Sequence, residues 1–473
     1  MSKIKFGLIG AGARAGSLAS TMMKDDKKRG DLIALCDINE NNLQKSEKMV
    51  EKHLSHGTQN YTDYKDAVII STPDMLHHDM AIDAFDAGKH VFLEKPVGIT
   101  LNEMIDILQA QKRSRKIMEV GYVLRYAPFF VEMKKMIENG EIGRPLFASA
   151  LEEYYGAYHF YRGWWKKREN TGGIMVQKIC HDMDLHYWMF GKPKKTSAFK
   201  SLMEFKPGSW DNKGALRCSE CNNHCPYYTK PEGGRTNSDE CVFNDSHEIA
   251  DNCQIIIQFE SGLNLSMGMN FFCAREQSDR HWKVVGSKGE ISGKLSQGLI
   301  RYDERFDSSI DLNETKVYQC NPPGLGGHGG GDSVQMLAFM QGIIEGREAK
   351  AGVESAYWSS IMIMGAQLLP MKIGLLTSLV DENIILIGSK SNIPWQHLVG
   401  SFEDYRNPEY IDCPEGPQIV GHFKEMYDIE ANKPLEMTGK VVKVVGLPKR
   451  PEPDSDERYV EYQILIDEWK YKE

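Results

Sequence analysis

The chain has 473 residues, 41% of them hydrophobic and 26% charged, and this length exceeds the usual size of one core, so at least two domains are expected. The formal net charge of -9 at pH 7, with no basic stripe, argues against a nucleic-acid partner. The first apolar run starts at Ile4 and no run reaches the roughly 18 apolar residues of a membrane span, so we expect a cytoplasmic protein without a signal peptide or membrane association.

Short apolar runs alternate with helical patterns over residues 1–122. This alternation predicts an α/β domain in which helices wrap a doubly wound parallel sheet. The expected strands are residues 4–9, 32–37, 68–71, 91–94 and 117–122, and the expected helices end near residue 24 or cover about 41–53, 78–87 and 101–113.

The pattern changes to period two after a helix expected near residues 128–138. The alternating runs predict an open, mainly antiparallel sheet in an α+β domain over residues 123–385, which would bind substrate and mediate oligomerisation. The runs are 145–155, 196–205, 254–272 and 281–294, and the domain also holds a cysteine-rich loop at 206–250. Residues 386–473 form a C-terminal extension to which no role is assigned, with two expected strands at 440–445 and 458–466.

A glycine-rich loop, Gly10-Ala11-Gly12-Ala13-Arg14-Ala15-Gly16, follows the first expected strand. Gly10 permits a tight turn, and Gly12 lets the backbone approach a pyrophosphate. The small Ala15 lets the next helix pack closely, so that its N-terminus faces the phosphates. The order of strand, loop and helix predicts a Rossmann dinucleotide site that includes Gly10, Gly12, Ala13 and Arg14.

Asp37 closes the second expected strand, where a carboxylate can accept both ribose hydroxyls of an adenosine. The same charge would repel a 2'-phosphate, and no Arg or Lys follows directly. The sequence therefore favours NAD over NADP, although Arg14 leaves some room for NADP.

Further motifs give the chain a family resemblance over residues 1 to about 375. With the glycine loop, the chain resembles the family of glucose-fructose oxidoreductases, inositol dehydrogenases and MocA-type proteins. The motifs are Ser71-Thr72-Pro73 with His77, Glu94-Lys95-Pro96, Leu124-Arg125-Tyr126, and Gly172-Gly173 followed by His181-Asp182-Met183-Asp184. The resemblance implies that Lys95 lies beside the nicotinamide and the substrate hydroxyl, and that His181 acts as acid/base. It also implies that Ser71, Thr72, Pro73, His77 and Glu94 contact the cofactor and Arg125 the substrate.

The chemistry agrees with these roles. Oxidation of a secondary alcohol by hydride transfer needs a group that takes the hydroxyl proton, and a neutral imidazole with a pKa near ~6.5 suits that task. Lys95 follows a strand at the edge where ligands bind in such sheets, so it can hydrogen-bond the oxygen and offset its developing charge.

Residues 177–182 depart from the inositol dehydrogenase pattern, which has an Asp where this chain has Gln177. On a helix, Lys178 and His181 would share a face, so the lysine would lower the imidazole pKa and could also hold a second substrate hydroxyl. A solvated lysine is the alternative. Asp182 either orients an imidazole or favours the helix N-terminus.

Two further groups are candidates for binding substrate. The aromatic residues include Tyr155, Trp164 and Trp165, which could form a platform for a sugar ring or be ordinary core material. His328 precedes three glycines and Asp332, so this segment could approach a ligand closely or be a flexible loop in which Asp332 caps the next helix.

Four cysteines are closely spaced: Cys218, Cys221, Cys225 and Cys241. In a loop with little apolar content they could fold around structural Zn²⁺. An iron–sulfur cluster and plain reduced thiols are the alternatives.

The sequence thus predicts an NAD-dependent oxidoreductase that oxidises a ring hydroxyl of a sugar, glycoside or cyclic polyol to a ketone, and the resemblance suggests C3 of a glycoside. An NAD-dependent glycosidase with a recycled cofactor and a non-catalytic sugar or redox sensor are alternatives. The expected partners are a carbohydrate substrate and further copies of the chain, as a dimer or tetramer. Residues 61–68 run almost directly into a strand, so we expect a shorter crossover there than the family usually has.

Overall fold

The computed structural model describes residues 3–25, 28–51, 66–230, 238–244, 247–305, 315–320, 328–368, 383–390, 404–412, 418–425, 435–448 and 458–471. The chain divides into two compact units, Met1–Ala366 and Gln367–Glu473. The shortened crossover expected at residues 61–68 lies largely outside the described residues, which resume at Asp66.

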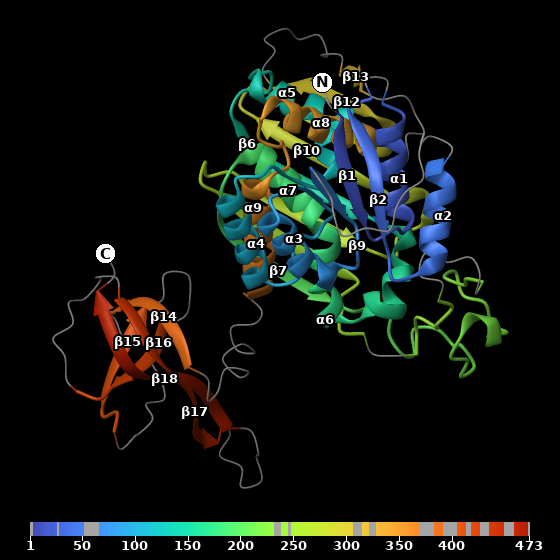
Figure 1. Ribbon diagram of the computed structural model, residues 1–473. Helices are drawn as coiled ribbons and strands as arrows, with labels where there is room; N and C mark the ends of the chain where they lie inside the picture. The colour runs from blue at the N-terminus through green and yellow to red at the C-terminus, as the bar shows by residue number, and fades with distance from the viewer. Residues whose placement is uncertain are drawn as a thin grey trace. The chain divides into compact units, whose positions relative to one another are not determined.

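A five-stranded parallel sheet forms the N-terminal part of the first unit (Figure 1). Its strand order is β2-β1-β3-β4-β5, which confirms the predicted Rossmann architecture. The strands are β1 (Ile4–Ile9), β2 (Gly30–Cys36), β3 (Ala67–Ile70), β4 (His90–Leu93) and β5 (Met118–Val120). The helices are α1 (Ala13–Met23), α2 (Glu40–Glu51), α3 (His77–Asp86) and α4 (Leu101–Ser114), with α5 (Pro128–Glu138) after β5.

The central strand β3 is short and wholly apolar because helices cover both faces of the sheet. All four residues of β3 are buried. The turn after β1 depends on Gly10, whose φ is +84° and whose added Cβ would lie 2.6 Å from the Ser71 carbonyl oxygen. A side chain there would push the glycine loop away from the end of β3.

A second sheet of eight strands follows in the order β13-β12-β11-β10-β6-β9-β8-β7. Neighbouring strands are antiparallel except β6 and β9, which confirms the mainly antiparallel prediction. The alternating run at 254–272 is two strands, because Gly262 (φ +86°) turns the chain between them. The strands are β6 (Pro145–Glu153), β7 (Pro193–Ser201), β8 (Asn252–Phe259), β9 (Asn264–Asn270), β10 (Asp279–Gly286), β11 (Gly289–Lys294), β12 (Leu299–Glu304) and β13 (Lys316–Gln319).

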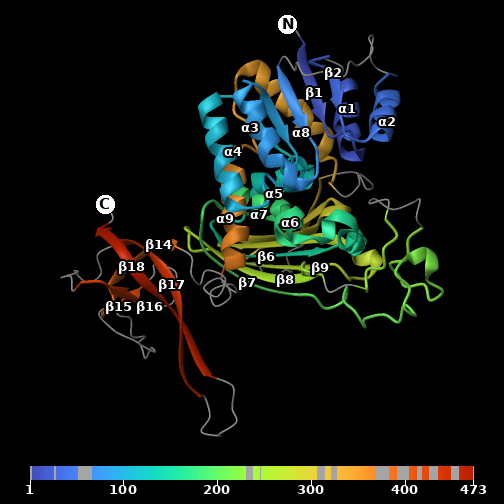
Figure 2. The same cartoon turned by 60° about the horizontal axis from the view of Figure 1, so that its bottom comes forward.

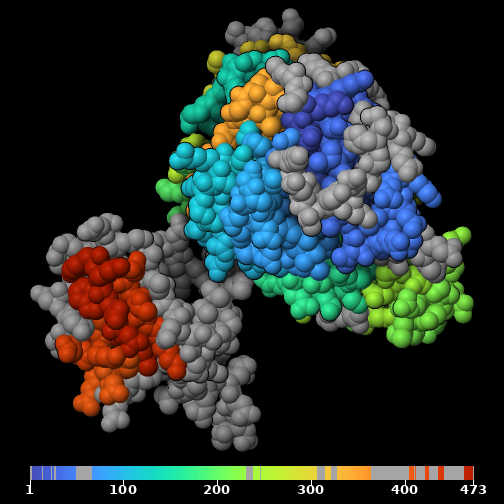
Figure 3. Space-filling model, in the orientation of Figure 1, coloured from blue at the N-terminus to red at the C-terminus, as the bar shows by residue number. Residues whose placement is uncertain are grey.

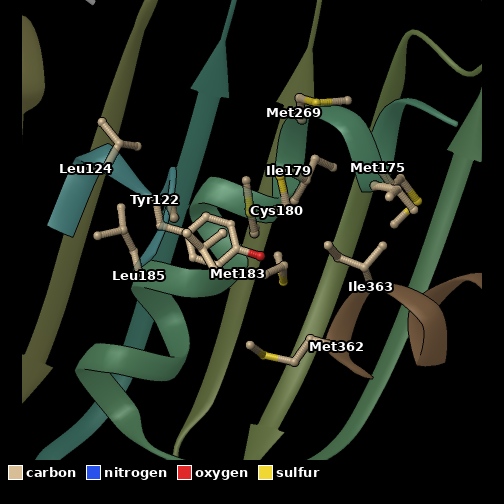
Figure 4. Packing of buried hydrophobic residues seen from close by; sticks show 14 of the residues in the cluster. Tyr122, Leu124, Met175, Ile179, Cys180, Met183, Leu185, Met269, Met362 and Ile363 are labelled. Atoms are coloured by element: carbon tan, nitrogen blue, oxygen red, sulfur yellow. The ribbon is translucent and has the colours of Figure 1, made fainter. Parts of the chain in front are cut away.

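Helices α6 (Arg168–Thr171) and α7 (Cys180–Phe190) cover the face of this sheet that is turned toward the Rossmann domain (Figure 2). The core beneath them is rich in methionine and includes Met183 of α7, Met269 of β9 and Met362 of α9 (Val353–Leu368) (Figure 4). Helix α8 (Gly331–Glu345) packs instead on the Rossmann sheet, where Phe339 contacts Phe6 and Phe92. The Rossmann sheet therefore has one apolar cluster on each face, and the larger of the two continues into the eight-stranded sheet.

The second unit contains a closed five-stranded barrel in the order β14-β15-β16-β18-β17. Its strands are β14 (Asn383–Lys390), β15 (Asn407–Asp412), β16 (Gln418–Phe423), β17 (Leu435–Pro448) and β18 (Arg458–Tyr471). Only the last two had been expected. The unit begins at Gln367, whereas the extension had been placed from residue 386, within β14. Buried apolar side chains line the described part of the barrel, together with a buried His422–Gln463 hydrogen bond of 2.7 Å.

No helix within the described ranges is long and apolar enough to cross a membrane.

A buried ion pair joins the segment after β5 to α7. Arg125 donates from Nε to Asp184 Oδ2 at 2.7 Å and from Nη1 to the Lys350 carbonyl oxygen at 2.7 Å. Both side chains are buried. Arg125 had been expected to bind substrate, but these bonds give its guanidinium a structural role.

We predict that Arg125→Ala lowers the free energy of unfolding by about 3–5 kcal/mol, because it leaves Asp184 buried without its counter-charge. Denaturation followed by circular dichroism measures this loss. The matched control is Arg113→Ala, which removes an exposed pair with Asp86 at 3.9 Å and should cost less than about 1 kcal/mol. Equal losses in the two variants would contradict the structural role of Arg125.

Candidate active site

The glycine loop leaves space for a phosphate at the first turn of α1. Gly12 precedes the helix with an ordinary extended backbone (φ -72°, ψ -175°), and an added Cβ there would meet no atom within 4 Å. Backbone N–H groups and the positive end of the helix dipole meet at such a position. The geometry therefore fits the pyrophosphate of a dinucleotide.

Asp37 is held against this loop. Its Oδ2 accepts from the Ala11 backbone N–H at 2.8 Å and from Asn42 at 3.2 Å, and its Oδ1 accepts from the Asn39 backbone N–H at 2.7 Å. A carboxylate has about four acceptor positions, so one is left for a ribose hydroxyl. A 2'-phosphate at this place would meet a carboxylate.

Arg14 is neutralised by two carboxylates. Its Nε donates to Glu94 Oε1 at 2.6 Å, and its Nη1 is ion-paired with Asp332. These bonds connect the glycine loop, the end of β4 and the start of α8. Because two carboxylates already bind its guanidinium, Arg14 is a poor partner for a 2'-phosphate. This pairing supports the predicted preference of the site for NAD over NADP.

His77 holds the two loops at the carboxyl ends of β3 and β4. Its Nδ1 lies 2.6 Å from the Pro96 carbonyl oxygen, and its Nε2 lies 3.0 Å from that of Thr72. Burial lowers the pKa of this imidazole. The segment Ser71-Thr72-Pro73 therefore follows the carboxyl end of β3, and His77 contacts the backbone of both this segment and the loop after β4.

Lys95 and His181 lie close together at this edge. The Nζ of Lys95 donates to the Gln177 carbonyl oxygen at 2.8 Å. His181 is buried, and its pKa is held well below the ordinary value by burial and then by the charges of Lys95 and His328. Nδ1 of His181 has no hydrogen-bond partner among the described residues. The site therefore presents a neutral imidazole beside an ammonium group.

A turn of π-helix precedes α7. It covers Met175–Ile179 and follows Gly172 and Gly173, both of which have positive φ angles. Such a turn disturbs the usual spacing of helix hydrogen bonds and is frequent at functional sites. Here the Gln177 carbonyl accepts from Lys95, and the Gln177 Oε1 is buried without a partner in the described chain.

Lys178 and Asp182 belong to a buried network of four charges. Lys178 Nζ lies 3.0 Å from Glu152 Oε1, and Arg280 Nη2 lies 2.6 Å from the same oxygen. Arg280 also donates to Asp182 at 2.9 and 3.2 Å. Asp182 therefore orients Arg280, not an imidazole as one interpretation had it. Lys178 does lower the pKa of His181, but less than Lys95 does.

Sequence reasoning missed Glu152 and Arg280, although a signal was present. Both occupy inward-facing positions of period-two strands, β6 and β10, where the neighbouring inward residues are apolar. The two residues are directly opposite each other in the strand register. A charged residue at an inward position on each of two strands is the pattern that predicts a buried ion pair.

Asp74 was also missed. It lies in the first turn after Pro73 and is buried, with Oδ2 lacking a partner among the described residues. Burial raises its pKa to about 7, and the charge of Lys95 opposes that rise. No motif marked this residue, because its environment comes from the fold.

The aromatic residues form one connected cluster beside the charge network. The ring of Tyr154 lies 4.2 Å from Lys178 Nζ, and Trp165 lies 4.9 Å from His159, measured between ring centroids. Trp164 packs on Trp165. Tyr155 lies farther out, where its hydroxyl donates to the Pro226 carbonyl oxygen of the cysteine-rich loop.

His328 lies on the other side of His181, at a ring-centroid distance of 5.9 Å. Its Nδ1 is 3.1 Å from Asp332 Oδ2. A turn closed by the Gly331 N–H and the His328 carbonyl oxygen brings this imidazole beside His181, and its role in binding substrate remains a prediction.

The cysteine-rich loop lies at one side of the first unit (Figure 3). The Arg162 guanidinium donates to Cys218 Sγ at 3.4 Å, and Asn212 donates to Cys241 Sγ at 3.3 Å. Across the described ranges, no group of three or more His, Cys, Asp or Glu side chains is arranged to hold a metal ion. The geometry thus does not support the predicted zinc site at Cys218, Cys221, Cys225 and Cys241.

Two family models match the chain. Residues 4–122 match an oxidoreductase family with an NAD-binding Rossmann fold, and residues 130–292 match the GFO/IDH/MocA C-terminal domain. Together they cover more than half of the chain, and the predicted resemblance is confirmed.

Several curated proteins are similar to the chain. The oxidoreductase-family protein YteT of Bacillus subtilis (strain 168) is 26% identical over 63% of this chain and 79% of its own length. An inositol 2-dehydrogenase of Salmonella typhimurium is 27% identical, and the match covers 41% of this chain and 56% of that protein. A 1,5-anhydro-D-fructose reductase of Ensifer adhaerens is 32% identical over 37% of this chain and 50% of that protein.

Among solved structures, a levoglucosan dehydrogenase in complex with NADH and levoglucosan has the same fold. Its TM-score is 0.63 at 18% identity, and the match covers 78% of this chain and 98% of that one.

We predict that Gly12→Ala weakens NADH binding by about ten-fold or more, about 1.4 kcal/mol, because the added methyl group enters the space for the phosphates. Fluorescence titration measures the affinity, and the thermal midpoint should stay unchanged, since the methyl group meets no protein atom.

The matched variant is Gly10→Ala, which should lower both the thermal midpoint and the affinity because of its backbone angle and the contact with Ser71. Unchanged NADH affinity in Gly12→Ala would contradict the placement of the phosphates.

Proposed function

Because the chain belongs to the GFO/IDH/MocA family of NAD-binding oxidoreductases, we propose that it transfers a hydride between NAD and a ring hydroxyl of a sugar, glycoside or cyclic polyol. The oxidised product is a keto-sugar, and for a glycoside we place the ketone at C3. The observation that carries the proposal is the pair of Lys95 and the neutral, buried His181 beside the glycine loop.

Each group has a defined task in the oxidation. The Lys95 ammonium hydrogen-bonds the substrate oxygen and offsets the negative charge that develops on it. The neutral imidazole of His181 accepts the hydroxyl proton. NAD, when bound, supplies the hydride acceptor. In the reduction, the same groups stabilise the oxygen and return the proton.

Unpartnered polar atoms support a polyhydroxylated substrate. His181 Nδ1, Gln177 Oε1 and Glu152 Oε2 are buried and have no hydrogen-bond partner within the described chain. Buried polar atoms are rarely left unpaired, and a ligand can supply the missing bonds. The hydroxyl groups of a sugar or inositol both donate and accept. The names of the inositol and levoglucosan dehydrogenases agree with this class of substrate.

The aromatic cluster would hold one face of the ring. Trp165 Nε1 is buried and has no partner among the described residues, so it can donate to a hydroxyl. Trp164 packs on Trp165, and Tyr155 extends the cluster toward the cysteine-rich loop. This arrangement supports recognition of a group attached to the ring as well as the ring itself.

The open face of the eight-stranded sheet supports a homo-oligomer. Phe147 of β6, Phe199 of β7 and Ile256 of β8 are 45%, 77% and 58% exposed. Apolar side chains gathered on one face of a sheet are typical of an interface. We place a second copy of the chain on this face, and light scattering of the purified protein tests it.

We predict that the protein with NAD and a panel of free sugars, inositols and aryl glycosides produces NADH, measured at 340 nm, while release of the aglycone is followed in parallel. NADH accumulation is the expected result. Aglycone release without NADH would overturn net oxidation and indicate a glycosidase with a recycled cofactor. Cofactor and ligand binding without turnover would indicate a sensor.

We predict that Lys95→Met lowers kcat by about a hundred-fold, or about 2.7 kcal/mol, while the Kd for NADH changes less than about three-fold, since the lost interaction stabilises the transition state. Lys112→Met on the exposed face of α4 is the control. Full activity of Lys95→Met would remove Lys95 from the mechanism.

A further inference from the structure

We infer that His328, oriented by Asp332, is a second acid–base group that carries the substrate proton from the buried His181 toward solvent. The inference rests on the proposed oxidation, and it adds a proton path that the pair of Lys95 and His181 does not contain.

The turn that carries His328 is specified by glycines. Gly329 and Gly330 have φ angles of +56° and +88°, and a Cβ on Gly331 would lie 2.3 Å from the Val123 carbonyl oxygen. The Gly331 N–H donates to the His328 carbonyl oxygen at 3.1 Å, which closes the turn. These constraints place His328 just before the N-terminus of α8, with its ring toward His181.

Asp332 gives the His328 ring its orientation. Both carboxylate oxygens lie near Nδ1, at 3.1 and 3.2 Å, and an N–H at Nδ1 leaves Nε2 to exchange a proton elsewhere. Arg14 holds the carboxylate from the other side and is itself bound to Glu94. A base oriented by a carboxylate is the arrangement that stabilises an imidazolium during proton transfer.

A proton taken up by His181 needs a path to solvent. His181 is only 5% exposed, and the neighbouring charge of Lys95 disfavours its protonated form. His328 is 39% exposed at its side chain and lies beside a carboxylate, so a proton that reaches it can leave to water. The two ring centroids lie 5.9 Å apart, a separation that is short enough for one water molecule to bridge the imidazoles.

The step balances without any further reactant. The C–H bond of the alcohol breaks and its hydride goes to NAD. The O–H bond breaks and its proton goes to His181, then through water to His328, and then to solvent. Reduction of the ketone uses the same path in reverse. The carbonyl forms as both bonds break, and each histidine ends neutral.

The test compares His328→Ala with wild type in the NADH-forming reaction. We expect kcat to fall by about ten- to a hundred-fold, while the Kd for NADH and the thermal midpoint stay close to wild type. Added imidazole should restore most of the lost rate, since it replaces the missing ring, and the solvent deuterium isotope effect on kcat should rise in the variant. A structural role for His328 would produce neither effect.

The matched control is His78→Ala, which removes an imidazole paired with Asp79 and Asp106 on α3, outside the site. This variant should keep the wild-type kcat, and added imidazole should not change it. As a second variant, Asp332→Asn keeps the size of the side chain and should lower kcat with NADH affinity retained.

Three results would overturn the inference. If His328→Ala keeps wild-type kcat, or loses activity that imidazole does not restore, the relay is wrong and the proposed oxidation stands. If wild type itself forms no NADH with any member of the panel, the proposed function fails and the relay fails with it.

Discussion

The charge of Lys95 at the carboxyl end of β4 is the interaction on which the site depends. It lies beside His181, whose pKa it lowers together with burial, and beside Asp74, whose pKa it keeps from rising further. Its own position comes from backbone geometry, through the bond to the Gln177 carbonyl in the π-helical turn. After burial, this one ammonium group has the largest effect on the pKa values of both neighbours.

Two of the other cations near the site are each bound by a pair of carboxylates. Arg14 is shared by Glu94 and Asp332, and Arg280 is shared by Glu152 and Asp182. Removing water from a charge is costly unless a partner of opposite sign and hydrogen bonds compensate for it. These pairs therefore hold four elements in position around the place of the substrate. The first connects the glycine loop to α8, and the second connects α7 to the sheet.

The two units use different physical solutions for their cores. The first unit packs α7 and α9 against the open sheet with many methionines, and the second closes a sheet on itself so that no long edge is left. The single buried polar pair described in the barrel, His422 with Gln463, is satisfied within it. The described part of the barrel has its own buried apolar residues, in agreement with its separation from the first unit at Gln367.

The sequence by itself determined the Rossmann sheet and the glycine loop, because periodicity and short motifs report local conformation and strand ends. The choice of Lys95 and His181 came from the family resemblance. It did not reveal the barrel, since β14 to β16 are short and lack a strong alternation. It also could not assign partners to Asp182, Arg125 or the cysteines. Only the tertiary structure decided that Asp182 faces Arg280, that Arg125 faces Asp184 and that His328 faces His181. Residues 98, 59 and 147 positions apart meet in these contacts, and local sequence carries no information on which distant charge folding will place beside another.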